Sequence, residues 1–277
     1  MAGLQELRKG LRSIRSTGQL AGAMRTAATA KYARLNRVRG DFAPYAQACE
    51  TMLHTLGNSG IRRETDTPRH RDAVVLMSSN RGLCGGFNAE LFRYFAQRPN
   101  ESEEAPLLFT FGKKAAVWLR EQGLEGEDFP VSDVPAYTEA KALSDRLRQL
   151  YVTGEAERII VVYQSFHNML TQIPAERQIL PEPRPQEEIK DVELLYLPDR
   201  ETIGEQLAVS CLDTALFNLA LESAAGAQAA TLVAMRSACD NAEASAAKLE
   251  ITINRRRQAE VTASVIETAA GNLQQGD

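Results

Sequence analysis

The chain has 277 residues, of which 44% are hydrophobic and 25% are charged, a composition typical of a globular protein with ample material for a core. Its formal net charge of −4 argues against a general nucleic-acid binder. Charges from Glu6 to Arg12 argue against the apolar core of a signal peptide. No uninterrupted run of about 18 apolar residues is present, so no membrane-spanning segment is expected.

Residues 1–57 are expected to form one long helix. Apolar residues recur at alternating spacings of three and four over nearly eight heptads, with Gly18, Arg25 and Arg39 as the exceptions. The core helix of a globular domain rarely sustains this pattern, so it indicates one strand of a coiled coil. The segment is basic, with nine Lys/Arg and three Asp/Glu, and the turn GNSG at 57–60 is expected to end it.

Residues 70–205 change to the pattern of a small α/β domain. Short apolar runs rich in β-branched and aromatic residues predict strands, and helical patterns lie between them. This alternation indicates a mostly parallel sheet. The predicted strands are 73–77, 107–111, 158–164, 171–180 and 193–197, and the predicted helices are 89–98, 113–122 and 138–151.

A glycine-rich stretch, SSNRGLCGGFN at 78–88, lies between the first of these strands and the first helix. A strand, a glycine loop and a helix are the usual setting of a phosphate cradle. However, GLCGG is not GxGxxG, and no GK[ST] follows to supply a phosphate-binding lysine. We therefore interpret Gly82, Gly85 and Gly86 as residues of a close-packed turn, with Cys84 as a small buried side chain.

The last segment, residues 206–277, is alanine-rich and helical. Heptad spacing is clear from residue 232 to residue 253, and the net charge of the segment is −3. Neither terminal helix can bury its apolar stripe alone, so antiparallel pairing of the two is expected. The predicted fold is thus a small Rossmann-like α/β domain (70–205) inserted between two long terminal helices (1–57 and 206–277) that form an antiparallel coiled coil.

The cysteines and histidines give no sign of a metal site. Cys49, Cys84, Cys211 and Cys239 lack metal-ligand spacing, and reduced, buried thiols of a cytoplasmic protein are the better interpretation. The three histidines show no HExxH or paired arrangement. No metal and no other cofactor is therefore expected.

Three stretches resemble the gamma subunit of F-type ATP synthases. LRSIRSTGQLAGAMRTAATAKYARL (11–35) is similar to the N-terminal helix of that family, and SSNRGLCGGFN to its S-D-R-G-L-C-G-G-x-N. Residues 234–271 are similar to its A-M-x-x-A-T-x-N-A and R-Q-A-x-I-T stretches. In order and spacing, these motifs cover essentially the whole chain.

The sequence departs from the family pattern at several positions. Gly226 and Ala227 stand for the usual Ser-Glu, Thr231 for an Arg and Asn80 for an Asp. Ile253 and Val261 replace a Tyr and an Ile. These departures put the family's charged contacts around residues 226–231 in question.

The resemblance implies the central rotor shaft of an ATP synthase, with no catalytic residue of its own. Implied partners are the alpha and beta subunits of the catalytic hexamer, the epsilon subunit and the c-subunit ring. The implied location is peripheral, at the cytoplasmic face of the inner (plasma) membrane. The transported ion and the direction of the reaction are not implied.

The resemblance also suggests contact residues. These are Met24, Arg25, Lys31, Arg257, Gln258 and Thr262 toward the alpha and beta subunits, and Tyr196 toward the c ring or the epsilon subunit. Ordinary structural roles are also possible for some of these residues. The RRRQ stretch at 255–258 could be a solvated basic face, Arg25 could snorkel from the apolar stripe, and Tyr196 could be a core aromatic.

Two alternative functions, an enzyme and a scaffold, have weaker support in the sequence. A nucleotide-binding α/β enzyme would use the Gly82–Gly86 loop, but no partner motif supports Cys84 as a nucleophile. A coiled-coil scaffold or nucleic-acid arm would use the basic first helix, but this helix lacks interleaved aromatic residues. Its cationic residues are Arg8, Arg12, Arg15, Arg34 and Arg37.

Overall fold

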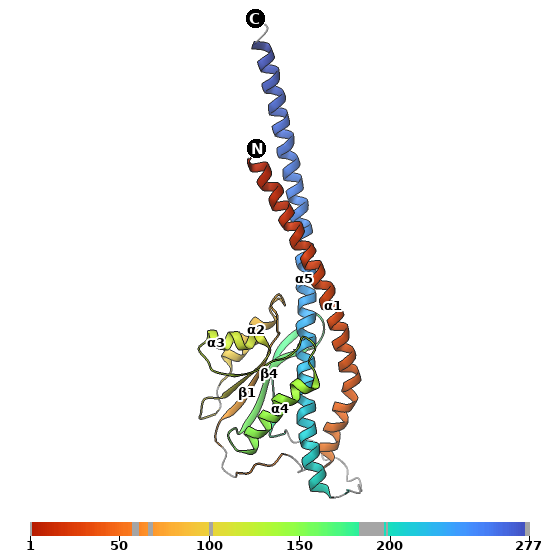
Figure 1. Cartoon of the computed structure of the whole chain (residues 1–277), viewed down its shortest axis with the longest axis vertical. Coiled ribbons are helices and arrows are strands. Elements are labelled where there is room, and N and C mark those ends of the chain that lie inside the picture. Colours follow the sequence, from red (N-terminus) through yellow and green to blue (C-terminus); the bar gives the residue numbers. More distant parts are fainter. Residues whose placement is uncertain are drawn as a thin grey trace. The chain divides into compact units, whose positions relative to one another are not determined.

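The computed structural model describes residues 2–56, 61–65, 69–99, 102–182, 197 and 199–274 (Figure 1). They form two compact units, one of residues 1–27 and 234–277 and the other of residues 28–233. The three segments expected from the sequence follow changes of pattern along the chain, whereas these units follow compactness in space. The three-part division therefore stays a prediction.

Two long helices are present, as predicted: α1 (Ala2–Leu56) and α5 (Arg200–Gln274). The most deeply buried α1 residues, Ala21, Ala28, Leu35, Cys49 and Leu53, follow the predicted stripe.

One stripe position was predicted wrongly. Arg25 is exposed, and its neighbour Met24 is the half-buried residue at this level of α1. The stripe continues unshifted at Ala28 and Leu35, so this exception is local: an arginine is rarely buried, whereas a methionine readily is.

The unit of residues 1–27 and 234–277 is an antiparallel helix pair. A Cβ added to Gly18 would lie 3.1 Å from the Cβ of Ala242, and one added to Gly10 would lie 3.6 Å from Leu249. Near the start of α1, Gly3 faces the side chain of Arg256. This order confirms the predicted antiparallel pairing, with α5 continuing beyond the level at which α1 begins.

The other unit contains a five-stranded sheet in the order β3-β2-β1-β4-β5. Its first four strands are mutually parallel, and β5 pairs antiparallel with β4. The strands are β1 (Asp72–Met77), β2 (Leu107–Phe111), β3 (Glu127–Phe129), β4 (Arg158–Phe166) and β5 (Gln172–Leu180).

The mostly parallel α/β prediction is confirmed, but β3 was missed. It has three residues, two of them acidic, so it carries no hydrophobic pattern. The predicted strand at 193–197 lies outside the described residues, apart from Leu197.

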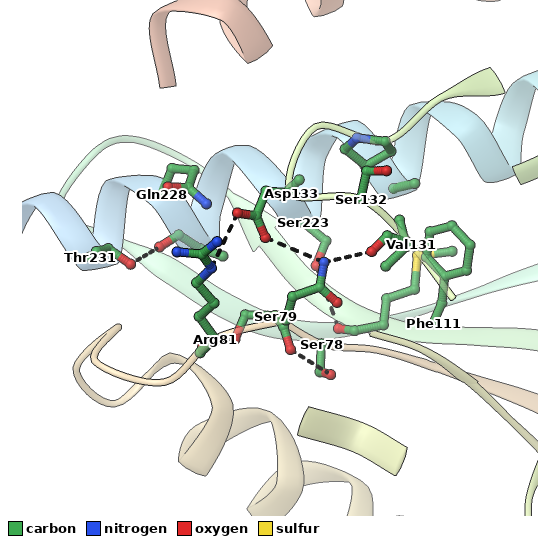
Figure 2. Close-up of a pocket in the computed structure, with 16 residues that line it drawn as sticks. Ser78, Ser79, Arg81, Phe111, Val131, Ser132, Asp133, Ser223, Gln228 and Thr231 are labelled. Atoms are coloured by element: carbon green, nitrogen blue, oxygen red, sulfur yellow. Dashed lines mark hydrogen bonds and ion pairs between the residues drawn. The ribbon is translucent and has the colours of Figure 1, made fainter. Parts of the chain in front are cut away.

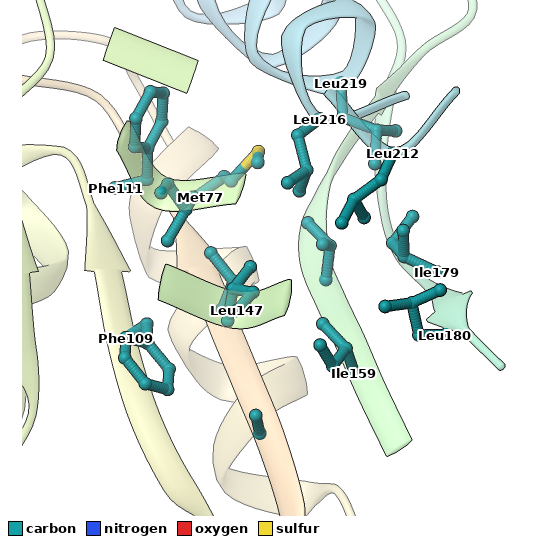
Figure 3. Close-up of a cluster of buried hydrophobic side chains, with 14 of the residues drawn as sticks. Met77, Phe109, Phe111, Leu147, Ile159, Ile179, Leu180, Leu212, Leu216 and Leu219 are labelled. Carbon is teal, nitrogen blue, oxygen red and sulfur yellow. The ribbon is translucent and has the colours of Figure 1, made fainter. Parts of the chain in front are cut away.

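Helices cover both faces of the sheet. On one face, α2 (Phe87–Gln97) and α3 (Lys113–Glu121) pack through Leu91 and Ala115 on Val74, Leu76 and Val162. On the other face, α4 (Tyr137–Val152) and α5 form the larger core (Figure 3). There Leu147 of α4 and Leu212, Leu216 and Leu219 of α5 meet the alternate residues of β1, β2 and β4.

The second half of α1 packs on α5 from a further side. Leu35 and Phe42 of α1 meet Phe217 and Leu221, and the Phe42 and Phe217 rings stand edge to face at 4.9 Å.

Part of α5 is apolar and long enough to cross a membrane by length and composition alone. However, 61% of that window is buried within the chain, as expected of a core helix.

The loop after β5 contains one carboxyl group in an apolar setting. Burial raises the pKa of Glu182 from 4.5 to about 7, and its Oε1 has no hydrogen-bond partner among the described residues. Because the folded chain holds this proton more tightly than the unfolded chain, Glu182 costs stability as the pH rises from about 4.5 to 7.

We expect the Glu182→Gln variant to be more stable than the parent chain at pH 8, by about 1–3 kcal/mol. The raised pKa sets about 3 kcal/mol as the upper limit, and partial exposure lowers it. At pH 4 the carboxyl is protonated in the folded chain, so the two proteins should match within about 0.5 kcal/mol. Urea unfolding at both pH values measures this, and equal differences at pH 4 and pH 8 would contradict it.

Candidate functional site

The glycine-rich stretch at 78–88 folds onto itself at the end of β1. The Asn88 side chain accepts a hydrogen bond from the Ser79 amide at 3.2 Å and donates to the Ser79 hydroxyl at 2.7 Å. It also donates to the sulfur of Cys84 at 3.2 Å. Cys84 is 3% exposed, which confirms it as a small buried side chain. The loop is therefore closed by its own side chains.

The same stretch caps helix α3, which follows the neighbouring strand. The amide of Ala115 donates to the Ser78 hydroxyl at 2.7 Å, and that of Lys114 donates to the Ser79 carbonyl at 3.1 Å. The amide of Lys113 donates to the Asn80 side chain at 3.2 Å. Free amides at a helix N-terminus are what would bind a phosphate. In α3 the protein itself occupies them.

The glycine that this arrangement needs is Gly112, at the start of α3. Its φ is +122°, and an added Cβ would lie 2.2 Å from the carbonyl oxygen of Ser78. Within the loop, Gly85 has a left-handed φ of 58°. A Cβ on Gly82 would meet only Lys114 at 3.8 Å, an ordinary contact, and one on Gly86 would meet only the mobile end of Glu90. Close packing at Gly82 and Gly86 was therefore a wrong prediction.

In doubly wound sheets, ligands bind beside the strand ends at which the strand order reverses. Here that point lies between β1 and β4, and protein fills it. The Gln164 amide of β4 donates to the Phe87 carbonyl at 2.7 Å. Phe87 and Cys84 are buried against Ala227 of α5, and a Cβ on Gly226 would lie 3.1 Å from the Phe87 ring.

A cavity of about 40 Å³ remains at this edge, between the loops and α5 (Figure 2). It can hold a few water molecules, whereas small-molecule pockets typically measure about 300–1,000 Å³. Among the described residues, no group of three His, Cys, Asp or Glu could hold a metal ion. This edge therefore lacks the space for a nucleotide, and the N-terminal amides of α3 are not free to bind one.

One acidic residue beside this cavity gathers charge from two other segments. Asp133, in the loop between β3 and α4, forms ion pairs with Lys31 of α1 and with Arg81 at 3.4 Å. Its other oxygen accepts from the Asn80 amide at 3.4 Å. Burial alone would raise the pKa of Asp133, but the Lys31 hydrogen bond and the two cations together hold it below 3.8.

Comparison with known proteins identifies the family. The sequence profile described as ATP synthase matches residues 3–272. The chain is 33% identical to the ATP synthase gamma chain of Chlorobaculum parvum and 30% identical to that of Desulforamulus reducens, in both cases over 98% of each chain. This chain belongs to the ATP synthase gamma family.

Solved structures confirm the fold of the family. A chain of the Euglena gracilis mitochondrial ATP synthase, from a structure titled OSCP/F1/c-ring, matches with a TM-score of 0.72. The match covers 99% of this chain and 95% of that one at 18% identity. Proteins of the ATP synthase gamma family are not themselves catalytic, which agrees with the filled edge of the sheet.

Three of the six departures from the family motifs lie around the cavity. Asn80, Ala227 and Thr231 all line the cavity, where the family pattern has Asp, Glu and Arg. The Thr231 hydroxyl donates a hydrogen bond to the Ala227 carbonyl at 2.8 Å. At the position of the family's arginine, this side chain therefore bonds only within its own helix among the contacts described. The family's charges are thus absent from this side of α5, and an alanine fits the apolar contact of Ala227 with Cys84 and Phe87.

The predicted contact residues differ in their surroundings. Arg257, Gln258 and Thr262 are exposed on α5, and the Thr262 hydroxyl donates to the Gln258 carbonyl. Arg25 is exposed, Met24 is half-buried and Lys31 is paired with Asp133. Tyr196 lies outside the described residues.

Sequence reasoning missed Gly112 and Asp133. The run LLFTF-GKK, a strand followed directly by a glycine and a helix, is a local signal that could have pointed to Gly112. No local signal marks Asp133, because its partners are 102 and 52 residues away in the chain.

We expect the Gly112→Ala variant to lose about 3 kcal/mol or more of unfolding free energy, because its Cβ would overlap the Ser78 carbonyl and its φ is strained. The matched control is Gly82→Ala in the glycine-rich loop, which should change stability by less than about 1 kcal/mol. Urea unfolding of both variants tests this. A loss at Gly82 equal to that at Gly112 would contradict the capping role of this edge.

Proposed function

We propose that this chain is the rotating central shaft of an F-type ATP synthase that couples ion-driven rotation to conformational changes in the catalytic subunits. The observation that carries the proposal is the antiparallel helix pair of residues 1–27 and 234–277. A two-stranded coil resists twisting better than a single helix does. Its close contact at Gly18 and Ala242, and the Arg15–Glu250 ion pair across it, tie the two helices together.

The end of α5 is suited to turning inside a sleeve. All residues from 254 to 266 are exposed, including the apolar Val261, Val265 and Ile266. Exposed apolar side chains at this density indicate a surface that partners cover. At 1.5 Å per residue, the helix from 257 to 274 is roughly 27 Å long, which is enough to be surrounded by a ring of subunits.

Partners follow from the family. The solved relatives carry titles that name a rotor, an F1/c-ring assembly and a central stalk with a c ring. For this chain we propose the alpha and beta subunits around the helix pair, and the c ring with the epsilon subunit at the α/β domain. The F1 part of such a complex is peripheral on the membrane, and we propose the cytoplasmic face for this chain.

In this mechanism, ion flow turns the c ring and the shaft turns with it. Because the shaft is asymmetric, it presses each of three beta subunits in turn through open, loose and tight states. The shaft supplies shape and stiffness and leaves the chemistry to its partners. Met24, Arg25, Arg257, Gln258 and Thr262 are the proposed contacts with the alpha and beta subunits. Lys31, also predicted as such a contact, is set apart because it pairs with Asp133. Tyr196 is proposed to contact the c ring or the epsilon subunit.

We expect the double variant Arg257→Ala, Gln258→Ala to lower the rate of coupled ATP synthesis by about fivefold or more, as loss of roughly 1 kcal/mol of partner contact would. Both residues are exposed on α5, so circular dichroism and thermal unfolding should not change. The rate is measured in vesicles that contain the assembled complex.

The control removes the same residue types from an exposed face of α2, as Arg93→Ala, Gln97→Ala. Unchanged synthesis in the α5 variant would remove the contact proposal, and an equal loss in the α2 control would make the effect nonspecific.

Two measurements separate the shaft from an enzyme. Co-expression with alpha and beta subunits should yield an assembled ATPase, and failure to assemble would contradict the proposed function. Titration calorimetry of the isolated chain with MgATP should give no saturable heat, because the amides of α3 and the strand ends are occupied by protein.

A further inference from the structure

Three segments of the unit 28–233 meet at Asp133. The carboxylate lies in the loop between β3 and α4, Lys31 comes from α1, and Asn80 and Arg81 follow β1 (Figure 2 shows the Arg81 and Asp133 side chains). The Asp133 side chain is 20% exposed and that of Lys31 31%, so the pair is shielded from most solvent. Such a pair is screened by salt less than one on the open surface.

The loop that carries Asp133 is tied to the sheet edge and to α4 by hydrogen bonds. The Asn80 amide donates to the Val131 carbonyl at 2.7 Å. The Glu139 carboxylate of α4 accepts from the Ser132 amide at 3.0 Å and from its hydroxyl at 2.6 Å. The sheet edge and α4 therefore hold Asp133 through polar contacts, and its carboxylate offers Lys31 an anchor on the α/β domain.

Near Lys31 the other contacts of α1 are mainly apolar or aromatic, and the Arg39 guanidinium lies 5.4 Å from the Phe166 ring. Further along α1, Glu50 forms an exposed ion pair with Arg177 of β5 at 2.8 Å. Leu35 packs in a cluster with Val134, Phe217 and Leu221, and the Tyr32 ring lies 6.1 Å from that of Phe166. Apolar contacts hold a helix against a surface but specify its rotation and register weakly, because they have no direction. A partly buried ion pair with one geometry can specify them.

We propose that the Lys31–Asp133 pair is an electrostatic lock that fixes the rotation and register of α1 on the α/β domain, so that both helices of the shaft turn with the domain. Lys31 is thus a positioning residue that acts through Asp133, and its role lies inside the chain in place of a contact with a catalytic subunit. The inference rests on the proposed function, because the lock matters only for a chain that carries torque.

The departures explain why Lys31 is needed for this. Position 231, where the family pattern has an arginine, lines the same cavity as Asp133 and is a threonine bonded within its own helix. No cation can therefore reach Asp133 from this position of α5. Arg81 is 76% exposed, and its side chain pairs with Asp133 at a longer distance than Lys31 does.

The test is a double-mutant cycle in the assembled, membrane-reconstituted complex. The variants are Lys31→Met, Asp133→Asn and the two together, which remove the charges with little change of volume. The readout is the number of ions pumped per ATP hydrolysed, which loss of stability alone would not change in the complexes that remain assembled. We expect each single variant to lower this ratio by roughly two- to fivefold, and the double variant to lower it no further.

The control Arg34→Met removes an exposed cation from the same helix and should leave the ratio unchanged. Additive losses in the double variant would show that Lys31 acts on a different partner and would overturn the lock. A normal ratio in Lys31→Met would overturn it as well.

A second arm adds Thr231→Arg to Lys31→Met. This arm offers Asp133 a cation from α5 beside the same cavity, but it does not tie α1 to the domain. The lock therefore predicts no recovery of the ratio, and recovery would show that Asp133 needs only a neutralising charge and would overturn the lock. Failure of the unmodified chain to assemble with alpha and beta subunits would instead contradict the proposed function, so the two failures are distinguishable.

Discussion

The structure depends most on one stretch of α5, from about residue 208 to residue 229, that is mainly apolar and is buried on nearly every side. Such a helix is stable only when other elements surround it. The sheet and α4 cover one side of it, where they pack on Leu212, Leu216 and Leu219. Helix α1 covers another side, where it packs on Phe217 and Leu221. The α/β domain and the second half of α1 are thus parts of one core built around the shaft helix, which is the attachment that torque transfer requires.

The carboxyl edge of the sheet shows how a nucleotide-binding topology can serve a mechanical role. The strand order and the glycine-rich loop are those of a ligand site, but the N-terminal amides of α3 and the strand ends are used internally. Ser78, Ser79 and Asn80 occupy the amides of α3, while Phe87 and the small residues 226 and 227 close the strand ends. The polar groups that would bind a ligand here join neighbouring elements of the domain.

The sequence was a good guide wherever the cause of the structure is local and periodic. The long helices, the antiparallel pairing, four of the five strands and the three shorter helices follow from hydrophobic patterns, so their bounds were predicted within two residues for most elements. One failure has a nonlocal cause. β3 forms because β2 offers it an edge. The exception at Arg25 is instead local, because the apolar Met24 is buried in preference to a charged side chain and the stripe resumes at Ala28.

The candidate site was harder to predict because its parts are distant in the chain. A glycine-rich loop draws attention, yet the glycine under the strongest steric constraint is Gly112, 26 residues beyond it. Asp133 lies in a short polar loop that no motif marks, and only the fold brings Lys31 and Arg81 to it. Charged side chains that join distant elements are hard to recognise in a single sequence, because they are the same residue types as ordinary surface charges.

The neutral side of α5 and the lock at Asp133 are two aspects of one arrangement. With alanine at 227 and threonine at 231, α5 meets the loops through small, uncharged groups, and this allows the close contact of Gly226 with Phe87. A carboxylate left beside such a surface would be costly to bury without a cation. The cations come from α1 and from the loop after β1. Because α5 supplies no cation here, the ion pair that Asp133 needs also ties α1 to the domain. An arginine on α5 would neutralise Asp133 without any contact to α1. In this chain Asp133 is neutralised by Lys31, so its need for a cation joins α1 to the domain that turns the shaft.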